Sequence, residues 1–380
     1  MLSDDHPLPA YRLCLVCISL RAGGTERVVS KVANHLSQKH AVSILLLSRT
    51  TPFYKACSNV SILRPQLERR SEAGWRWYPR MLGYLWQSLR SSDPDLVLCF
   101  GEPIAPSVLS VARAQGRRVM VFNRASPLTS LRGQRGLLNP FTYPLAARVV
   151  VQTQHAIDLM QARYRFCRFG VLPNPIDIPD RVPPMAQRHR RVINIGTLGG
   201  KKNQKELIRI FASIESQTEW TLDLVGDGPD RKALEQLIQT LELKESVRLL
   251  GRQSNVDALL HDSSIFAFTS LTEGFPNALA EAMAAGCACI SYDCPTGPSE
   301  LIEHGVDGFL VDPGDEAEYR RLLQRLIDEP DLREKFSRNA RESMKRFEAG
   351  TVMGRLEDMI GEAIDKKQAQ GARIKDQGKQ

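Results

Sequence analysis

Two glutamates with seven residues between them, Glu273 and Glu281, are the acids in this sequence best placed for chemistry. An apolar run over 265–268 precedes them and predicts a buried strand. Gly-Phe-Pro over 274–276 predicts a tight turn, after which alanine, leucine and methionine recur at helical spacing. The sequence therefore predicts a strand, a loop carrying the first acid, and a helix carrying the second.

This arrangement suits a sugar diphosphate. Ligands of open α/β sheets bind beyond the carboxyl ends of the strands, and a helix start favours a phosphate. The backbone N–H groups of Asn277, Ala278 and Leu279 would face that phosphate. Two flanking acids could hold the hydroxyls of the sugars on either side. The alternative is an ordinary helix whose acids are solvated.

Two further glycine-rich loops predict phosphate sites. Gly23-Gly24 follows an apolar strand over 11–20 and precedes a helix, so a ligand could approach the backbone there. A second loop over 196–203 follows a strand at 192–195 and carries Lys201 and Lys202, which makes it a candidate diphosphate cradle.

The surrounding elements alternate between strand and helix. Further strands are expected at 42–47, 60–63, 96–100, 119–122, 149–151, 220–225, 247–251 and 288–292. This alternation predicts βαβ units and Rossmann-like parallel sheets. A chain of 380 residues exceeds one typical core, and the proline-containing stretch 178–190 suits a linker between two domains.

Composition limits the functional classes. No apolar run is long enough to span a bilayer, and the first residues lack the features of a signal peptide, so we expect a cytoplasmic protein. Residues 1–180 hold 23 Lys and Arg against 11 Asp and Glu, which suits an anionic partner or a solvated basic face. The eight cysteines and seven histidines form no complete metal motif, so we expect reduced thiols and no metal.

Arginines and aromatic residues are interleaved over 64–90. They are Arg64, Arg69, Arg70, Trp75, Arg76, Trp77, Tyr78, Arg80, Tyr84, Trp86 and Arg90. Such a stretch suits a membrane interface, and a helix packed on the sheet is the equal alternative. Nucleic-acid binding uses similar residues, but the chain has no recognisable nucleic-acid module, so we expect no nucleic-acid partner.

Four motifs of this sequence resemble those of glycosyltransferase family 4. They are the Glu273-x7-Glu281 spacing, Gly-Gly-x-Glu-Arg-Val over 23–28, Asn-Pro-Ile-Asp over 174–177 and Asp-Cys-Pro-Thr-Gly-Pro-Ser-Glu over 293–300. The resemblance implies a retaining enzyme with the GT-B fold, two Rossmann-like domains facing a cleft. The implied boundaries are 1–177 for the acceptor-side domain, 178–190 for the linker and 191–350 for the donor domain. A helix near 351–365 would cross back to the first domain, and 366–380 would be a disordered tail.

The resemblance also implies roles for individual residues. Glu273 and Lys202 would be catalytic, with Glu273 on the donor sugar and Lys202 on the diphosphate. The residues implied in donor binding are Gly23, Gly24, Thr197, Lys201, Gly226, Arg252, Gly274, Phe275, Asn277, Ala278, Leu279 and Glu281. Thr197 stands where relatives carry an arginine. Asn123 and Arg124 open the loop that faces the acceptor in relatives.

The implied reaction moves a hexose or N-acetylhexosamine, with N-acetylgalactosamine a candidate, from a UDP-sugar to a lipid-linked saccharide during assembly of a bacterial surface glycan or glycoprotein glycan. No cofactor or metal is expected, because cations and helix dipoles can hold the leaving diphosphate. A basic, aromatic first domain would rest on the inner leaflet of the cytoplasmic membrane. The alternatives are a GT-B sugar-nucleotide epimerase, a non-catalytic binding module, and a dinucleotide-binding protein, which the lack of G-x-G-x-x-G after the first strand disfavours.

Overall fold

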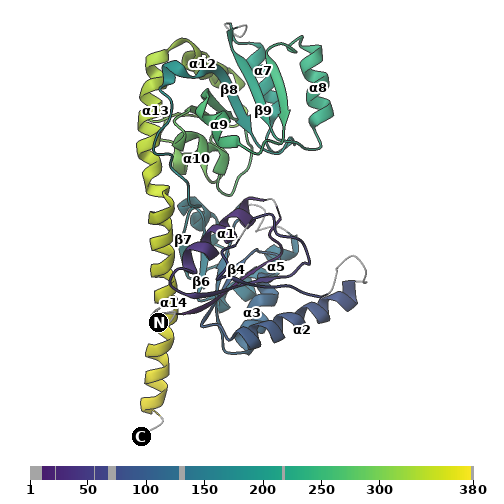
Figure 1. The fold of residues 1–380 in the computed structure, drawn as a ribbon, viewed down its shortest axis with the longest axis vertical. Coiled ribbons are helices and arrows are strands. Elements are labelled where there is room, and N and C mark those ends of the chain that lie inside the picture. Colours follow the sequence, from purple (N-terminus) through teal and green to yellow (C-terminus); the bar gives the residue numbers. More distant parts are fainter. Residues whose placement is uncertain are drawn as a thin grey trace, which may run out of the picture. The chain divides into compact units, whose positions relative to one another are not determined.

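The computed structural model describes residues 11–21, 23–54, 56–66, 74–127, 133–215 and 219–377. The chain divides into unit 1, Met1–Pro173 with Val352–Gln380, and unit 2, Asn174–Thr351. Figure 1 shows a twisted sheet with helices on its faces in each unit. None of the helices in the described ranges is long and apolar enough to cross a bilayer.

Unit 1 is built on seven parallel strands in the order β3-β2-β1-β4-β5-β6-β7. Their bounds are β1 Arg12–Cys17, β2 Ala41–Leu46, β3 Ser61–Leu63, β4 Leu96–Phe100, β5 Arg118–Phe122, β6 Arg148–Val151 and β7 Phe169–Val171. Apolar residues fill both faces of the central strands, as a parallel sheet covered by helices requires. The strand order reverses between β1 and β4.

Helices cover both faces of this sheet. They are α1 Gly24–Leu36, α2 Gly74–Ser92, α3 Ala105–Ala114, α5 Gly133–Thr142, α6 Gln154–Gln161 and α14 Ala349–Gln377, with a 3₁₀ turn η2 at Tyr143–Leu145. One face buries α1 and α14 against the sheet, and the other buries α2, α3, η2 and α6. Cys14 and Cys17 of β1 lie in opposite cores, as expected for residues three apart in a strand.

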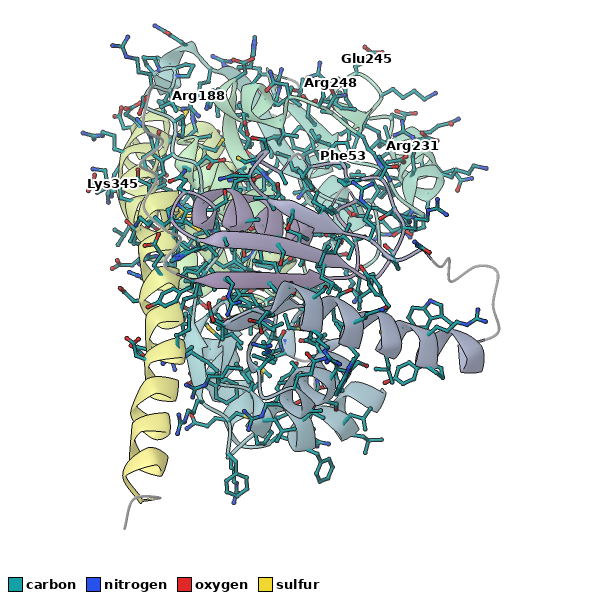
Figure 2. All side chains as sticks on the ribbon, turned by 60° about the horizontal axis from the view of Figure 1, so that its bottom comes forward. Phe53, Arg188, Arg231, Glu245, Arg248 and Lys345 are labelled. Carbon is teal, nitrogen blue, oxygen red and sulfur yellow. The ribbon has the colours of Figure 1, made fainter. Side chains whose placement is uncertain are left out.

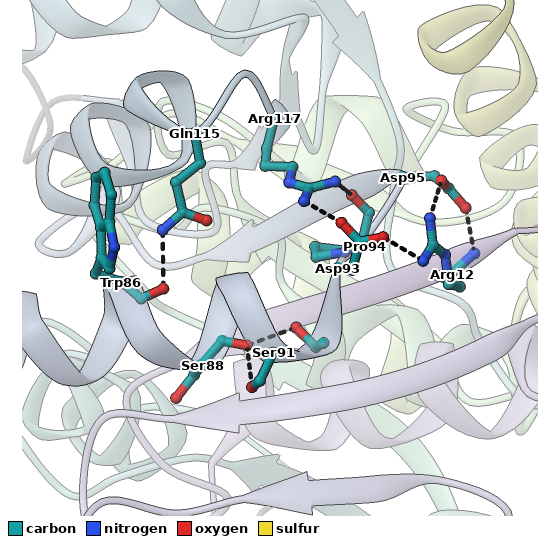
Figure 3. A network of polar contacts seen from close by, with 10 residues as sticks. Arg12, Trp86, Ser88, Ser91, Asp93, Pro94, Asp95, Gln115 and Arg117 are labelled. Carbon is teal, nitrogen blue, oxygen red and sulfur yellow. Dashed lines mark hydrogen bonds and ion pairs between the residues drawn. The ribbon is translucent and has the colours of Figure 1, made fainter.

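Ion pairs fasten the starts of the central strands of unit 1. Arg12 at the start of β1 binds Asp93 and Asp95, which lie just before β4, and Arg117, just before β5, also binds Asp93 (Figure 3). The Arg117 and Arg12 guanidinium groups lower the pKa of the Asp93 carboxyl below its usual value. These contacts occupy the amino edge of the sheet and leave the opposite, carboxyl edge available for ligands.

Unit 2 has six parallel strands in the order β10-β9-β8-β11-β12-β13, again with one reversal, between β8 and β11. The strands are β8 His189–Ile195, β9 Thr221–Val225, β10 Val247–Gly251, β11 Ser263–Phe268, β12 Ala288–Tyr292 and β13 Phe309–Val311. Asp223 of β9 is buried and ion-paired across the sheet. It accepts bonds of 2.7 and 2.9 Å from Arg248 of β10, labelled in Figure 2, and lies 3.0 Å from Arg191 of β8.

The helices of unit 2 also lie on both faces. They are α7 Gln204–Ala212, α8 Arg231–Thr240, α9 Val256–His261, α10 Asn277–Ala284, α11 Pro298–Leu301, α12 Glu316–Asp328 and α13 Pro330–Met344, with 3₁₀ turns η3 Met185–Gln187 and η5 Lys345–Phe347. Side-chain caps fix two starts: Asn255 accepts from the Ala258 N–H at 3.2 Å, and Asp315 accepts from Glu318 at 3.0 Å.

The unit boundaries differ from the sequence expectation in three places. Unit 2 begins at Asn174, because Ile176 is buried in its core and its backbone bonds to Phe347 and Ala349. Strand β8 begins at His189, inside the range assigned to the linker. Residues 366–377 continue helix α14, where a disordered tail was expected. Lysine, glutamine, alanine and arginine all favour helix, and no proline interrupts this stretch.

Candidate active site

Lys202 and Glu273 follow the two neighbouring strands of unit 2 at which the strand order reverses. Lys202 lies in the loop between β8 and α7, and Glu273 lies in the loop after β11. The two loops are joined by backbone: the Leu271 N–H donates to the Lys201 carbonyl at 2.9 Å, and the Thr269 hydroxyl donates to the Lys202 carbonyl at 3.0 Å. Reversal points are where open α/β sheets leave a crevice for ligands.

The two side chains meet as an ion pair. Lys202 Nζ lies 2.6 Å from Glu273 Oε1, and the side chains are only 26% and 13% exposed. The same ammonium lies 5.1 Å from the centre of the Phe268 ring, a cation–π distance. A half-buried pair of this kind holds one cation and one hydrogen-bond acceptor in fixed positions, so the structure brings together the two residues predicted to be catalytic.

Behind Glu273, the loop after β12 fixes its backbone. Thr296 adopts a left-handed conformation, with φ of 68°, and its hydroxyl donates to the Glu273 carbonyl at 2.5 Å. Cys294 is buried beside this carboxylate. Burial, followed by the charges of Glu273 and Asp293, raises the pKa of the Cys294 thiol to about 12, so the thiol stays protonated and unreactive.

The start of α10 offers two of the three predicted N–H donors. Asn277 N–H donates to the Phe275 carbonyl at 2.9 Å, because Pro276 turns the chain tightly before the helix. Within the described residues, the N–H groups of Ala278 and Leu279 have no acceptor. The Asn277 side chain is held by a 2.7 Å bond from Asn174. The helix start therefore presents a small, fixed anion site.

Glycines build the remaining loops of this edge by close backbone approach. Gly226 directly follows β9 with φ of +139°, and an added Cβ there would lie 1.9 Å from the Gly196 carbonyl oxygen. An added Cβ at Gly228 would lie 2.2 Å from the Leu198 carbonyl. Only glycine allows these two loops to touch, so Gly226 is needed for the backbone geometry of this edge, and its role in donor binding stays a prediction.

The other residues predicted in donor binding lie at different depths. Thr197, Lys201 and Arg252 are exposed in loops at the carboxyl edge of the sheet. Phe275 and Leu279 are buried in the core, Phe275 against the Phe347 ring, so they can offer only backbone groups. Two more are partly buried: Gly274 in the loop before α10, and Glu281 within α10.

Four of the predicted residues belong to unit 1. Gly23 is the residue before α1, in extended conformation, and Gly24 begins the helix. Asn123 is buried, and its side chain contacts Met160. The Arg124 guanidinium packs over the Phe100 and Phe122 rings, and burial lowers its pKa to about 10. Neither Asn123 nor Arg124 lines the unit 1 pocket described next.

That pocket, of about 870 Å³, lies beyond the carboxyl ends of β1, β2 and β4. Its lining is Ile18, Ser19, Arg21, Leu47, Ser48, Arg49, Thr50, Thr51, Trp77, Tyr78, Met81, Pro103, Ile104 and Ser107. Two arginines, six hydroxyl groups and two aromatic rings therefore face one hollow. None of the lining residues in the described part of the chain is acidic. No sequence motif predicts this site, because its residues come from four separate loops and helices.

The arrangement in unit 2 suits the departure of a diphosphate. A cation, two free backbone donors and a nearby carboxylate can hold a polyanion on one side and sugar hydroxyls on the other. Among the described residues, no three His, Cys, Asp or Glu side chains are grouped so as to hold a metal ion. Two parallel α/β sheets, each with a ligand edge at its reversal point, constitute the GT-B fold.

Comparisons with known proteins show which family this chain belongs to. A model described as Glycosyltransferase Family 4 matches residues 22–179, and one described as Glycosyl transferases group 1 matches residues 180–343. The two models together span most of the chain, so it belongs to this glycosyltransferase family and is an enzyme. The family predicted from the Glu273–Glu281 motif is confirmed.

Several bacterial relatives are similar over nearly the whole chain. An exopolysaccharide phosphotransferase of Streptomyces coelicolor is 27% identical over 91% of this chain, which spans only 40% of that protein. The amylovoran biosynthesis glycosyltransferase AmsD of Erwinia amylovora is 26% identical, covering 92% of this chain and 99% of the relative. An alpha-1,4-N-acetyl-D-galactosaminyltransferase of Campylobacter jejuni, named for an undecaprenol-linked substrate, is 24% identical over 92% of this chain and 98% of its own.

Among solved structures, HepE of Anabaena, crystallised with UDP and glucose, superposes with a TM-score of 0.76. The identity is 19%, and the match covers 93% of this chain and all of HepE. At this identity the likeness supports the fold, and it confirms the predicted GT-B class.

Proposed function

We propose that this glycosyltransferase moves a hexose or N-acetylhexosamine, with N-acetylgalactosamine the first candidate, from a UDP-sugar to a lipid-linked saccharide, with retention at the anomeric carbon. The observation that carries the proposal is the Lys202–Glu273 pair beside the free N–H groups of α10. The UDP bound to HepE and the undecaprenol-linked substrate in the Campylobacter relative's name support the donor and acceptor classes.

In this proposal, Lys202 and the α10 N–H groups hold the diphosphate as negative charge builds on it. Glu273 accepts hydrogen bonds from the donor sugar, and Glu281 accepts them from the nucleotide ribose. The bond from the anomeric carbon to the diphosphate oxygen breaks through an oxocarbenium-like state, and the acceptor oxygen attacks from the same face. The leaving phosphate takes the acceptor proton. No metal is required, so EDTA should leave turnover unchanged.

The acceptor is proposed to occupy the 870 Å³ pocket of unit 1. Trp77 and Tyr78 can stack on sugar rings, the six hydroxyl groups can exchange hydrogen bonds with them, and Arg21 and Arg49 can bind the acceptor's own diphosphate. A lipid-linked acceptor also places the enzyme at the inner face of the cytoplasmic membrane, peripherally bound.

The deciding experiment offers a panel of UDP-sugars with undecaprenyl diphosphate-linked saccharides and reads products by mass spectrometry. We expect one UDP-hexose or UDP-N-acetylhexosamine to give a product heavier by one sugar. Proton NMR of the new anomeric signal, with both anomers as standards, tests retention. Turnover of a GDP-sugar or CMP-sugar in place of every UDP-sugar would overturn the donor class.

A further inference from the structure

Helix α5 and the turn η2 present an apolar stripe to solvent. Leu137, Leu138, Phe141 and Leu145 are 66%, 53%, 80% and 44% exposed. Their spacing of one, four and eight residues from Leu137 places them along one side of a helix. Of residues 137–145, Asn139 and Tyr143 are buried, and Tyr143 packs in the apolar core of unit 1. The outer side of this stretch is apolar as well, unlike that of an ordinary surface helix.

An arginine pocket adjoins the end of this stripe. A hollow of about 310 Å³ is lined by Arg113, Arg118, Pro144, Leu145, Ala146, Ala147, Phe166 and Arg168. Leu145 belongs both to the stripe and to this hollow. Phe166, on the loop before β7, is 87% exposed. We call the five exposed apolar residues and the three arginines together the α5 patch.

The three arginines of the α5 patch repel one another. Burial, followed by the charges of Arg113 and Arg168, lowers the pKa of Arg118. Among the residues described, none of the three arginines forms an ion pair, and no acid lines the hollow. A group of cations without a carboxylate partner gains stability when an anion enters.

We propose that the α5 patch docks this enzyme on an anionic lipid bilayer. The leucines and phenylalanines enter between the lipid headgroups, and the three arginines bind lipid phosphates. A second copy docked through the same patch would bring two arginine clusters together. Nucleic acid would match the arginines and leave the leucines exposed. This proposal rests on the proposed function, because docking on a bilayer would give the enzyme access to a lipid-linked acceptor. The docking itself needs no sugar donor.

This location differs from the membrane stretch expected at 64–90. Residues 67–73 lie outside the described residues. The apolar side of α2, with Met81, Leu85 and Leu89, is buried in the core, as the alternative of a helix packed on the sheet predicts. Trp86 of α2 is 41% exposed, about half as much as Phe141 or Phe166. Exposed Trp86 and Arg90 therefore serve as matched controls on a second surface of the same unit.

The test is co-sedimentation of the full-length chain with vesicles of phosphatidylcholine, alone or with phosphatidylglycerol. We expect binding to the phosphatidylglycerol vesicles at low salt and loss of binding as salt rises. Arg168→Glu and Phe141→Ser should each weaken binding about fivefold or more. Arg90→Glu and Trp86→Ser should bind like the wild type, and all four variants should keep the wild-type affinity for UDP in calorimetry.

Three results would overturn the proposal. The wild type could remain in the supernatant with anionic vesicles at low salt. The α2 variants could lose binding while the α5 variants keep it. Light scattering could show that Phe141→Ser splits a dimer without changing vesicle binding, which would make the α5 patch an interface between copies. Failure of every UDP-sugar to react would contradict the proposed function and would not affect the vesicle result.

Discussion

The carboxyl edges of the two sheets have the same topology but carry different side chains. In each sheet the strand order reverses once, between β8 and β11 in unit 2 and between β1 and β4 in unit 1. The unit 2 edge is closed by backbone contacts and by the Lys202–Glu273 pair. The unit 1 edge is an open pocket lined by arginines, hydroxyl groups and aromatic rings. The first suits one fixed polyanion, and the second suits a larger, varied ligand.

Removing the cation of the unit 2 edge should have the largest effect. Lys202→Ala deletes a donor aimed at the leaving diphosphate, so kcat should fall about 100- to 1,000-fold. The KM for UDP-sugar should change much less, because the charge on the diphosphate grows as the bond breaks. Steady-state kinetics measure both values. Lys201→Ala, in the same loop, is the control, and an equal loss there would show that loop charge matters and pairing with Glu273 does not.

The backbone contact at Gly226 tests whether the unit 2 edge depends on loop geometry. An alanine methyl group would overlap the Gly196 carbonyl at a φ that side chains avoid. We expect Gly226→Ala to lower the free energy of unfolding by about 2–4 kcal/mol and to weaken UDP binding. Gly200→Ala, in the same loop region with no neighbour within 4 Å, should do neither. Chemical denaturation and calorimetry separate the two effects.

Much of the unit 2 edge could be predicted from sequence because its residues are contiguous. A strand, a turn and a helix start within 265–284 fix where Glu273 and the α10 N–H groups lie, and Lys202 follows the neighbouring strand. The sequence could not predict that the Asn277 N–H is already bonded, because that bond depends on the turn conformation at Pro276. The burial of the Phe275 side chain could not be predicted either, because its packing partner Phe347 lies 72 residues further along the chain.

Glu281 tests how far the donor site of unit 2 extends along α10. With the ribose as its proposed partner, Glu281→Ala should weaken UDP affinity about 10- to 100-fold, the loss of hydrogen bonds to a charged group. Glu281→Gln, which keeps one acceptor oxygen, should recover part of that loss. Isothermal calorimetry with UDP measures it. An unchanged affinity in both variants would remove Glu281 from the nucleotide site.

The unit 1 edge was much harder to predict, for a physical reason. Asn123 and Arg124 follow a strand as ligand residues often do. Asn123 is buried against Met160, the partly buried Arg124 lies over the Phe100 and Phe122 rings, and their acceptor role stays a prediction. The residues that line the pocket come from after β1, after β2, from α2 and from before α3, and none forms a motif. Only the three-dimensional order of the strands brings them together. The apolar outer side of α5 was missed similarly, since the exposed side of a helix cannot be read from periodicity alone.

The arginines of the unit 1 pocket give the smallest effect and the sharpest test of the difference between the edges. Arg49→Glu replaces a cation with an anion in a pocket whose described lining residues include no acid. If this pocket holds the acceptor's diphosphate, the KM for a lipid-linked acceptor should rise about tenfold or more, and UDP affinity should stay unchanged. Arg90→Glu, outside the pocket on α2, should change neither value. A rise in KM that disappears with a water-soluble acceptor lacking the diphosphate would assign Arg49 to the phosphates. A loss of UDP affinity in Arg49→Glu would instead mean that this arginine serves the donor, and the division of labour between the two edges would fail.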